Sequence, residues 1–305
     1  MRDRHGEPLA KGIDAIQGSG DAGVRRGVEM SEVVVITGLA DGMGREVAKM
    51  LAAAGDSVAG FDVDAGGIET LGEELSKTSG SHLLDTIDIC DREAVLAFRD
   101  RVLAEYGHVD TVLSNVGIGF FSPFEEVDLA KALKCLEINV IGAACVLQAF
   151  IPSMRERKKG KLIAMSSLVG RIPFPFESIY SASKFAVTGM VMSLRYEVEP
   201  FGLRVALIEP AQVSTSFAAK IHTLPPEGSP YRERARRFID RDNKLIKTAP
   251  NPVEAAEKIV KVIRSDKPSL YNSVDTMSGV FQFLNKILPT RVRDSILINH
   301  MDIKV

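Results

Sequence analysis

Short runs of apolar residues recur through the first two thirds of the chain, separated by segments whose apolar positions lie three and four residues apart. Several of the runs are rich in valine and isoleucine, which is typical of strands that are buried on both faces of a parallel sheet. We predict strands at residues 33–36, 57–61, 82–87, 111–113, 161–165 and 203–208.

The segments between the strands have the spacing of helices that bury one face. We predict helices at residues 44–54, 68–75, 92–106, 128–154 and 178–198, and two more at residues 231–247 and 251–263. Strands that alternate with helices predict an α/β fold, a doubly wound parallel sheet of about seven strands flanked by helices. Such sheets bind ligands beyond the carboxyl ends of their strands.

The composition is that of a globular protein and excludes several classes of function. The 38 basic and 40 acidic side chains give a net charge of −2, so no basic face for nucleic acid is indicated. Cys90, Cys135 and Cys145 lack metal-binding spacing and are typical of a reducing compartment, and the histidines form no ligand-like cluster, so we predict no metal site. The longest apolar run, residues 140–151, is too short to span a bilayer. We expect a cytoplasmic protein.

Residues 1–30 differ from the rest of the chain. They mix basic and acidic residues around a Gly-Ser-Gly segment and lack the apolar core of a secretory signal. We predict a disordered leader. Because Met30 immediately precedes the first strand, a misassigned start codon is the alternative.

A glycine-rich turn follows the first predicted strand. Gly38, Gly42 and Gly44 lie between that strand and a helix, where glycines allow a pyrophosphate to approach the backbone and the helix offers free N–H groups. Asp62 ends the second strand, where a carboxylate can accept hydrogen bonds from ribose hydroxyls. A carboxylate there, with Asp41 in the loop, repels the 2′-phosphate of NADP, so we predict that NAD is preferred.

Tyr180 and Lys184 are four residues apart in a predicted helix, so their side chains leave the same face. A cation near a phenol favours the phenolate, so the pair can serve as a proton-transfer centre. Ser167 ends a strand, where its hydroxyl can donate to the same substrate oxygen. Ser166 is the competing hydroxyl, but its side chain points to the opposite side if the strand geometry persists. Alone, the Tyr-x-x-x-Lys pattern is weak.

With the glycine loop, Asn115, Asn139, Ser167, Tyr180 and Lys184 in this order, residues 31–215 resemble the short-chain dehydrogenase/reductase family, of the type with Thr-Gly-x-x-x-Gly-x-Gly and Tyr-x-x-x-Lys. The resemblance implies a Rossmann-type fold and an enzyme that interconverts an alcohol, primary or secondary, and its carbonyl. It also implies a homodimer or homotetramer that forms through the helices at residues 128–154 and 178–198.

The family's functional residues can be carried over position by position. The implied catalytic residues are Asn139, which bends the long helix and holds a water of the proton relay, together with Ser167, Tyr180 and Lys184. The implied cofactor-binding residues are Gly38, Asp41, Gly42, Met43, Gly44, Asp62, Asp88, Asn115, Gly117, Tyr180, Lys184, Pro210, Val213 and Thr215. The chain departs from the family pattern at Ser114, Val116 and Ala211, and Ala211 stands where glycine is usual, so the backbone there must avoid positive φ.

Beyond residue 215 the family pattern thins. We predict one catalytic domain, residues 31–275, with a substrate lid at 216–250 and an amphipathic C-terminal extension at 276–305. The apolar residues of 280–301, expected as one amphipathic helix, either pack on the domain or contact a membrane or lipid-like substrate. Phenylalanines flank the predicted site, namely Phe120, Phe121, Phe124, Phe174 and Phe176.

These features favour a bulky hydrophobic substrate, such as a steroid, a retinoid or a long-chain lipid, and NAD as the cofactor. One alternative is an NADPH-dependent reductase of a carbonyl or a 3-oxoacyl thioester. The other is a non-catalytic NAD-binding scaffold, although Tyr180 and Lys184 are both present.

Overall fold

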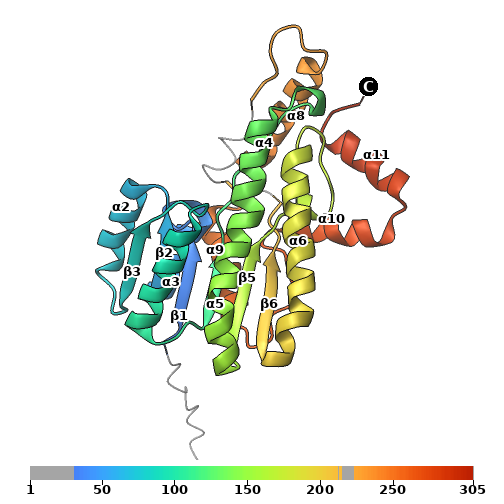
Figure 1. Cartoon of the computed structure of the whole chain (residues 1–305). Helices are drawn as coiled ribbons and strands as arrows, with labels where there is room; N and C mark the ends of the chain where they lie inside the picture. Colours follow the sequence, from blue (N-terminus) through green and yellow to red (C-terminus); the bar gives the residue numbers. More distant parts are fainter. Residues whose placement is uncertain (1–30, 212, 215–222, 305) are drawn as a thin grey trace, which may run out of the picture. The chain divides into compact units, whose positions relative to one another are not determined.

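A parallel sheet with the strand order β3-β2-β1-β4-β5-β6-β7 forms the centre of the protein, as the computed structural model shows (Figure 1). The structure describes residues 31–211, 213–214 and 223–304, which belong to one unit. The strands are β1 (Val33–Thr37), β2 (Ser57–Asp62), β3 (His82–Thr86), β4 (Thr111–Ser114), β5 (Gly160–Met165), β6 (Leu203–Ile208) and β7 (Tyr271–Asn272). Together with the flanking helices, the sheet confirms the predicted fold class. The predicted leader, residues 1–30, lies outside the described residues.

The strand order reverses at β1, because β2 pairs with one of its edges and β4 with the other. All five residues of β1 are buried, as the all-apolar valine-rich run predicts for a central strand. Where the order reverses, the loops after β1 and β4 diverge and leave a crevice at the carboxyl ends of the strands. The strand order of the sheet therefore determines where the crevice lies.

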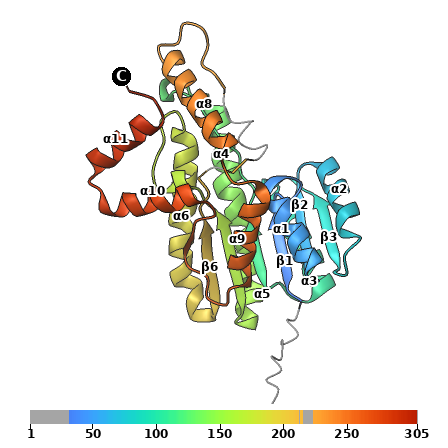
Figure 2. The same ribbon diagram turned by 180° about the vertical axis from the view of Figure 1, so that it is seen from behind.

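Helices cover both faces of the sheet (Figures 1 and 2). The helices α3 (Arg92–Tyr106), α5 (Ala143–Arg157) and α6 (Ser178–Val198) pack their buried residues into one core cluster with the sheet. The helices α1 (Gly42–Ala53), α2 (Ala65–Leu75) and α9 (Pro252–Arg264) form the corresponding cluster on the opposite face. Asn251 begins α9 by accepting a hydrogen bond from the backbone N–H of Glu254, a common way for a helix to start.

The long helix predicted at residues 128–154 is interrupted in the middle. It consists of α4 (Leu129–Leu136), a π-helical segment (Glu137–Gly142) and α5, and Asn139 lies in the π-helical segment. A π turn inserts one residue into the helix and changes the direction of the side chains around it. This is the local distortion that the family resemblance implies at Asn139.

Among the described residues, one helix, Leu129–Arg157, is long and apolar enough to cross a membrane by length and composition. The sequence expectation considered only residues 140–151 within it, an apolar run that is shorter and is interrupted by Gln148. The helix is also a core element, because Val146, Phe150 and Met154 are buried against the sheet. Its apolar character therefore has an explanation within the fold.

The C-terminal part packs above the carboxyl ends of the strands. It contains α8 (Arg232–Lys247), α10 (Thr276–Ile287) and α11 (Thr290–His300). The single amphipathic helix expected at 280–301 is wrong, because the chain breaks at Leu288, which is extended before Pro289. A third core cluster joins these helices to the loops beside the crevice, and Arg241 of α8 donates to the carbonyl of His300.

Candidate active site

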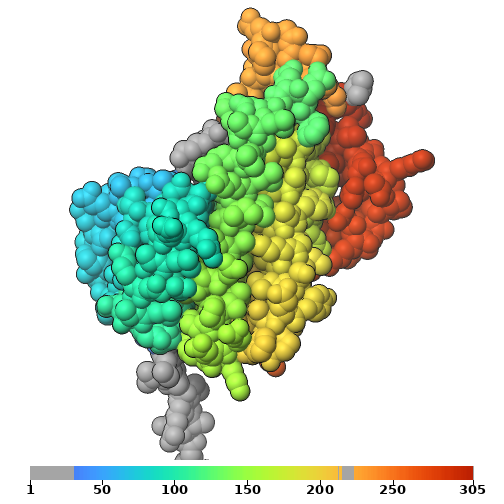
Figure 3. Space-filling view, viewed as in Figure 1, coloured from blue at the N-terminus to red at the C-terminus, as the bar shows by residue number. Residues whose placement is uncertain are grey.

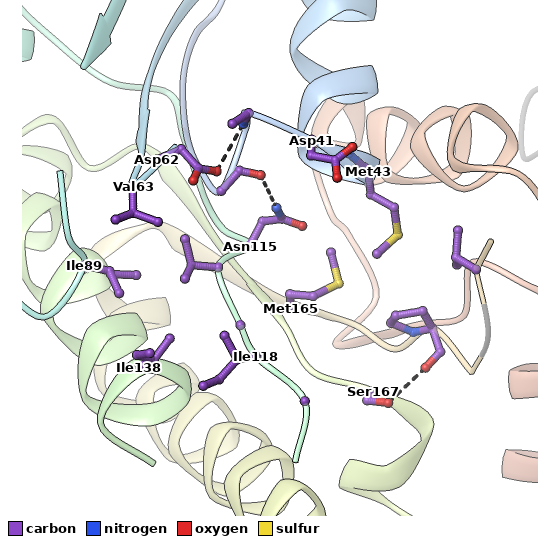
Figure 4. A pocket seen from close by; sticks show the side chains of 18 of the residues that line it. Asp41, Met43, Asp62, Val63, Ile89, Asn115, Ile118, Ile138, Met165 and Ser167 are labelled. Atoms are coloured by element: carbon purple, nitrogen blue, oxygen red, sulfur yellow. Dashed lines mark hydrogen bonds between the residues drawn. The ribbon is translucent and has the colours of Figure 1, made fainter. Parts of the chain in front are cut away.

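A cavity of about 640 Å³ opens at the carboxyl ends of β1, β4, β5 and β6 (Figure 4). Of the predicted cofactor-binding residues, those that line it are Gly38, Asp41, Gly42, Met43, Asp62, Asp88, Asn115, Gly117, Tyr180, Lys184, Pro210 and Val213. Gly44 does not line the cavity, and Thr215 lies outside the described residues. The predicted catalytic residues Ser167, Tyr180 and Lys184 share the cavity with the cofactor residues, whereas Asn139 lies behind its wall.

The glycine loop has a backbone conformation that residues with a Cβ atom rarely adopt. Gly38 and Gly42 have φ of +71° and +60°, in the left-handed region that favours glycine. A Cβ atom on Gly44 would lie 2.2 Å from the carbonyl oxygen of Gly38, so Gly44 allows α1 to pack directly onto the loop. The side-chain amide of Asn115 donates to the carbonyls of Thr37 and Gly38, at 3.1 and 2.9 Å (Figure 4). Gly44 and Asn115 therefore maintain the shape of a loop that can hold a pyrophosphate.

The acids of the predicted cofactor site bond to backbone N–H groups. The Asp62 carboxylate accepts from Ala40 at 3.1 Å and from Asp64 at 3.1 Å, which directs it to the rim of the cavity. Asp41 caps α1 by accepting from the N–H of Gly42 at 2.7 Å. Arg45 donates to the carbonyl of Ala40 and pairs with Glu74 at 3.0 Å, so an acid already compensates this nearby cation.

Asp88 follows β3 and lies at the far end of the same cavity. Its carboxylate accepts from the N–H of Cys90 at 2.9 Å and lies 3.9 Å from the Lys134 ammonium. The cavity is therefore long enough to extend from the end of β3, past the glycine loop, to Tyr180. An extended dinucleotide requires such a shape.

The predicted catalytic side chains are buried together. Tyr180 and Lys184 are 8% and 3% exposed and lie one turn apart on α6. The Ser167 hydroxyl hydrogen-bonds the Tyr180 phenol. It also donates to the carbonyl of Pro210 at 3.2 Å (Figure 4). The hydroxyl of Ser166 instead bonds that of Thr188 at 2.8 Å. Of the two adjacent serines, Ser167 is thus the one that contacts the phenol.

The pKa values in this group are displaced by burial. Burial is the main cause that raises the pKa of Tyr180 above its usual 10, the negative charge of Glu177 adds to the rise, and the Ser167 hydrogen bond opposes it. Burial lowers the pKa of Lys184 from its usual 10.5 to about 8. The Lys184 ammonium lies 5.7 Å from the centroid of the Tyr180 ring and donates to the carbonyl of Met165 at 2.9 Å. That Lys184 lowers the pKa of the phenol stays a prediction.

Asn139 holds the backbone of the loop that lines the cavity. Its side-chain oxygen accepts from the N–H of Ile118 at 2.8 Å, and its amide donates to the carbonyl of Ile118 at 2.9 Å and to the Ser183 hydroxyl at 3.0 Å. A Cβ atom on Gly117 would lie 3.1 Å from the Lys184 ammonium and 3.4 Å from the Asn139 side-chain oxygen. The glycine therefore leaves room between the lysine and the asparagine. The water-holding role of Asn139 stays a prediction.

Asp275 is a residue of the site that the sequence reasoning missed. It is 4% exposed, accepts from the N–H of Ala211 at 2.7 Å, and caps α10 by accepting from Ser278 at 2.7 Å. It thereby ties the segment after β6, which lines the cavity, to the C-terminal helices. The capping position of Asp275 could have been found in the sequence, but its bond to a residue 64 positions earlier could not. Ala211 avoids positive φ, as expected.

Residues 32–224 match the family model described as short chain dehydrogenase. The chain belongs to the short-chain dehydrogenase family. The resemblance inferred from the motifs is thus confirmed, and the protein is an oxidoreductase. Proteins of this family bind a nicotinamide dinucleotide.

Similar proteins include human 17-beta-hydroxysteroid dehydrogenase type 1, which is 32% identical over 252 residues, 78% of this chain and 76% of the relative. Mouse dehydrogenase/reductase SDR family member 7B is 34% identical over 203 residues, 65% of this chain and 62% of the relative. A solved short-chain dehydrogenase from Streptomyces avermitilis superposes with a TM-score of 0.74 and 28% identity, over 90% of this chain and 96% of that chain.

Proposed function

We propose that the protein is an NAD-dependent dehydrogenase that interconverts a primary or secondary alcohol and its carbonyl on a bulky hydrophobic substrate. The observation that carries the proposal is the hydrogen bond between Ser167 and the Tyr180 phenol. Both residues, together with Lys184, line the same cavity as the glycine loop. The cofactor supplies a hydride acceptor when it is bound. The protein's own groups then have to move the proton.

In alcohol oxidation, Tyr180 takes the proton of the substrate hydroxyl, and Ser167 donates a hydrogen bond to the oxygen that becomes negative. The raised pKa of the phenol means that it rests protonated, ready to act as the acid in carbonyl reduction. For oxidation it needs a positive charge nearby to favour the phenolate. Lys184, the neighbouring cation on the same helix face, is the residue that we assign to this role.

NAD is the cofactor that the acidic rim favours. Asp62 and Asp41 stand beside the loop that would hold the adenosine half, and Glu74 already neutralises Arg45, the cation close to them. A 2′-phosphate at this point would meet the negative charge of Asp62. Asp62 would instead accept hydrogen bonds from the two ribose hydroxyls of NAD.

An aromatic wall favours a hydrophobic substrate. The rings of Phe121, Phe176 and Phe238 lie 5.4 to 5.9 Å apart, centroid to centroid, and Phe176 lies two residues before α6, the helix that carries Tyr180. Phe176 has φ of +64°, an uncommon conformation for a large side chain and one that is often found at functional sites. We propose a steroid, a retinoid or a long-chain lipid alcohol as the substrate class, and the name of the human steroid dehydrogenase relative supports the first of these.

Two further surfaces belong to the proposal. Figure 3 shows the face formed by α4, α5 and α6, in green and yellow. These elements and the π-helical segment carry exposed apolar residues that suit a homodimer or homotetramer, namely Leu133, Ile141, Phe185, Met192 and Tyr196. On α10 and α11, exposed Val280, Phe283, Ile287 and Ile296 suit a peripheral membrane contact by a protein of the cytoplasm. The proposed lid includes α8, which packs against this hairpin.

A panel assay tests the proposal. Steroid alcohols, retinol and long-chain alcohols are offered to the purified protein with NAD and, separately, with NADP, and the reduced cofactor is measured by its absorbance. We expect oxidation of at least one hydrophobic class with NAD and weaker oxidation with NADP. A clear preference for NADPH in the reverse direction would favour the carbonyl or 3-oxoacyl thioester reductase. Cofactor binding without any turnover would favour the scaffold.

A further inference from the structure

The peptide bond between Pro210 and Ala211 is held from both sides. It follows β6, and both residues line the cavity. Its N–H group, that of Ala211, donates to the Asp275 carboxylate at 2.7 Å. Its carbonyl, that of Pro210, accepts from the Ser167 hydroxyl at 3.2 Å (Figure 4) and from the N–H of Leu168 at 2.8 Å. The bond is trans, so its N–H and its carbonyl point in opposite directions. The carboxylate and the hydroxyl therefore bind opposite edges of one rigid plane.

The Ser167 hydroxyl carries a single proton, which fixes the direction of its other hydrogen bonds. A carbonyl oxygen can only accept, so the proton of Ser167 is donated to Pro210. The hydroxyl oxygen is then the acceptor for the Tyr180 phenol and for the N–H of Val169 at 3.3 Å. The hydrogen bonds thus run from Tyr180 through Ser167 to the carbonyl of Pro210. The direction of that carbonyl decides how the hydroxyl is oriented toward the phenol.

Asp275 uses its two carboxylate oxygens for two different tasks. One oxygen accepts from the N–H of Ser278 at 2.7 Å and caps α10, and the other accepts from Ala211. The cap requires only one acceptor oxygen, which a serine or an asparagine also supplies. The second oxygen is what an aspartate adds, and it reaches a residue 64 positions earlier in the chain. The helix cap alone therefore does not account for the aspartate.

We propose that Asp275 is a positioning residue for the reaction, because through the peptide bond between Pro210 and Ala211 it orients the Ser167 hydroxyl. This inference rests on the proposed dehydrogenase function and adds a residue of the C-terminal part to it. Asp275 does not line the cavity, so it acts through Ser167. Reacting groups have to be held close to the productive geometry, and a displacement of about 1 Å can cost about 100-fold in rate. The effect of Asp275 therefore belongs to kcat.

The variant Asp275→Ser separates the helix cap from the bond to Ala211. A serine hydroxyl can still accept from Ser278, because serine begins helices about as well as aspartate does. It offers one side-chain oxygen where aspartate has two, so the N–H of Ala211 loses its acceptor. Asp91→Ser is the matched control, because Asp91 caps α3 by accepting from the N–H of Ala94 and lies outside the cavity. Thermal unfolding compares the stability of the two variants.

Steady-state kinetics with NAD and the best alcohol of the panel test whether Asp275 acts through Ser167. We expect Asp275→Ser to lower kcat by about 10- to 100-fold, to change the KM of the alcohol by less than about threefold, and Asp91→Ser to match wild type. In the Ser167→Ala background, Asp275→Ser should lower kcat by less than about threefold, because the group that it positions is gone. An equal loss in both backgrounds, or an unchanged kcat in Asp275→Ser, overturns the inference.

Amide hydrogen exchange, followed by NMR without substrate, tests the same link without any activity. We expect the N–H groups of Ala211 and Leu168 to exchange at least about 10-fold faster in Asp275→Ser, relative to the amides of β5, and at the wild-type rate in Asp91→Ser. Unchanged exchange of Leu168 overturns the inference, because the carbonyl of Pro210 is then held without Asp275. This measurement also decides if Ser167→Ala leaves no measurable turnover. If the wild-type protein oxidises no alcohol at all, the proposed function fails, whereas the exchange rates still show whether Asp275 holds the peptide bond.

Discussion

Apart from the apolar lining, the cavity carries exposed or half-buried carboxylates on the side of β1, β2 and β4, whereas on the side of β5 and β6 it carries buried hydroxyl and ammonium groups. Asp41 and Asp62 are held by N–H groups of their own loop or the adjacent one. Tyr180 and Lys184 are more than nine-tenths buried and have displaced pKa values. The first side suits a charged, elongated ligand, and the second suits proton transfer away from water.

The largest expected effect separates the two sides by chemistry. Tyr180→Phe removes the proton-transfer group but leaves the glycine loop untouched, so we expect kcat to fall by about 10²- to 10⁴-fold. Binding of NAD, measured by calorimetry, should change less than about threefold, since the glycine loop and Asp62, to which we assign the cofactor, are unchanged. If Tyr180→Phe keeps most of its turnover, proton transfer does not depend on the Tyr180 hydroxyl, and the assignment of proton transfer to this side of the cavity is wrong.

A steric change on the nucleotide side should give the next effect. Gly44→Ala places a methyl group against the Gly38 carbonyl, so the loop must shift. We expect a loss of NAD affinity of about 100-fold and a fall of about 1–3 kcal/mol in the free energy of unfolding, as overpacking typically causes.

Gly189→Ala is the matched control for Gly44→Ala. Gly189 lies on the exposed side of α6 in the region of helical φ, and an added Cβ meets no atom within 4 Å. That variant should bind NAD normally and should gain about 0.5–1 kcal/mol in the free energy of unfolding, because alanine favours a helix. Equal losses in the two variants would contradict the role given to the glycine loop.

A charge change on the same side should alter which cofactor is chosen. Asp62→Asn keeps an oxygen that can accept from Ala40 but removes the negative charge beside the adenosine ribose. We expect the ratio of kcat/KM for NADP to that for NAD to rise by about 10-fold, corresponding to about 1.4 kcal/mol. Asp91→Asn, at the cap of α3 and outside the cavity, is the control and should leave the ratio unchanged.

The smallest expected effect belongs to the buried side and concerns stability. The raised pKa of Glu177 means that the folded protein binds more protons than the unfolded chain between pH 4.5 and about 8. Its contribution to the free energy of unfolding is thus present at low pH and is lost as pH rises through this window. Between pH 5 and 8, Glu177→Gln should gain about 1–3 kcal/mol relative to wild type in chemical denaturation. A constant difference between the two proteins would mean that Glu177 does not titrate there.

The sequence predicted the nucleotide side better than the substrate side, for a physical reason. A turn with Gly38 and Gly44 between a buried strand and a helix is a local pattern, and Tyr180 and Lys184 are neighbours on one helix. The raised pKa of Glu177 depends in part on Asp242 of α8, and the bond from Ala211 to Asp275 joins residues 64 positions apart. Tertiary contacts decide such features, and a local pattern does not contain them. The break before Pro289 could have been predicted from the proline alone.

Transfer of deuterium from the carbinol carbon tests the central claim most directly. The best alcohol of the panel is labelled at that carbon and incubated with NAD and either the wild-type protein or Tyr180→Phe, and the reduced cofactor is examined by mass spectrometry and NMR. The account predicts that the wild-type protein yields reduced cofactor with deuterium on the nicotinamide ring and that the variant yields almost none. Deuterium released to water, or equal labelling by both proteins, would contradict it.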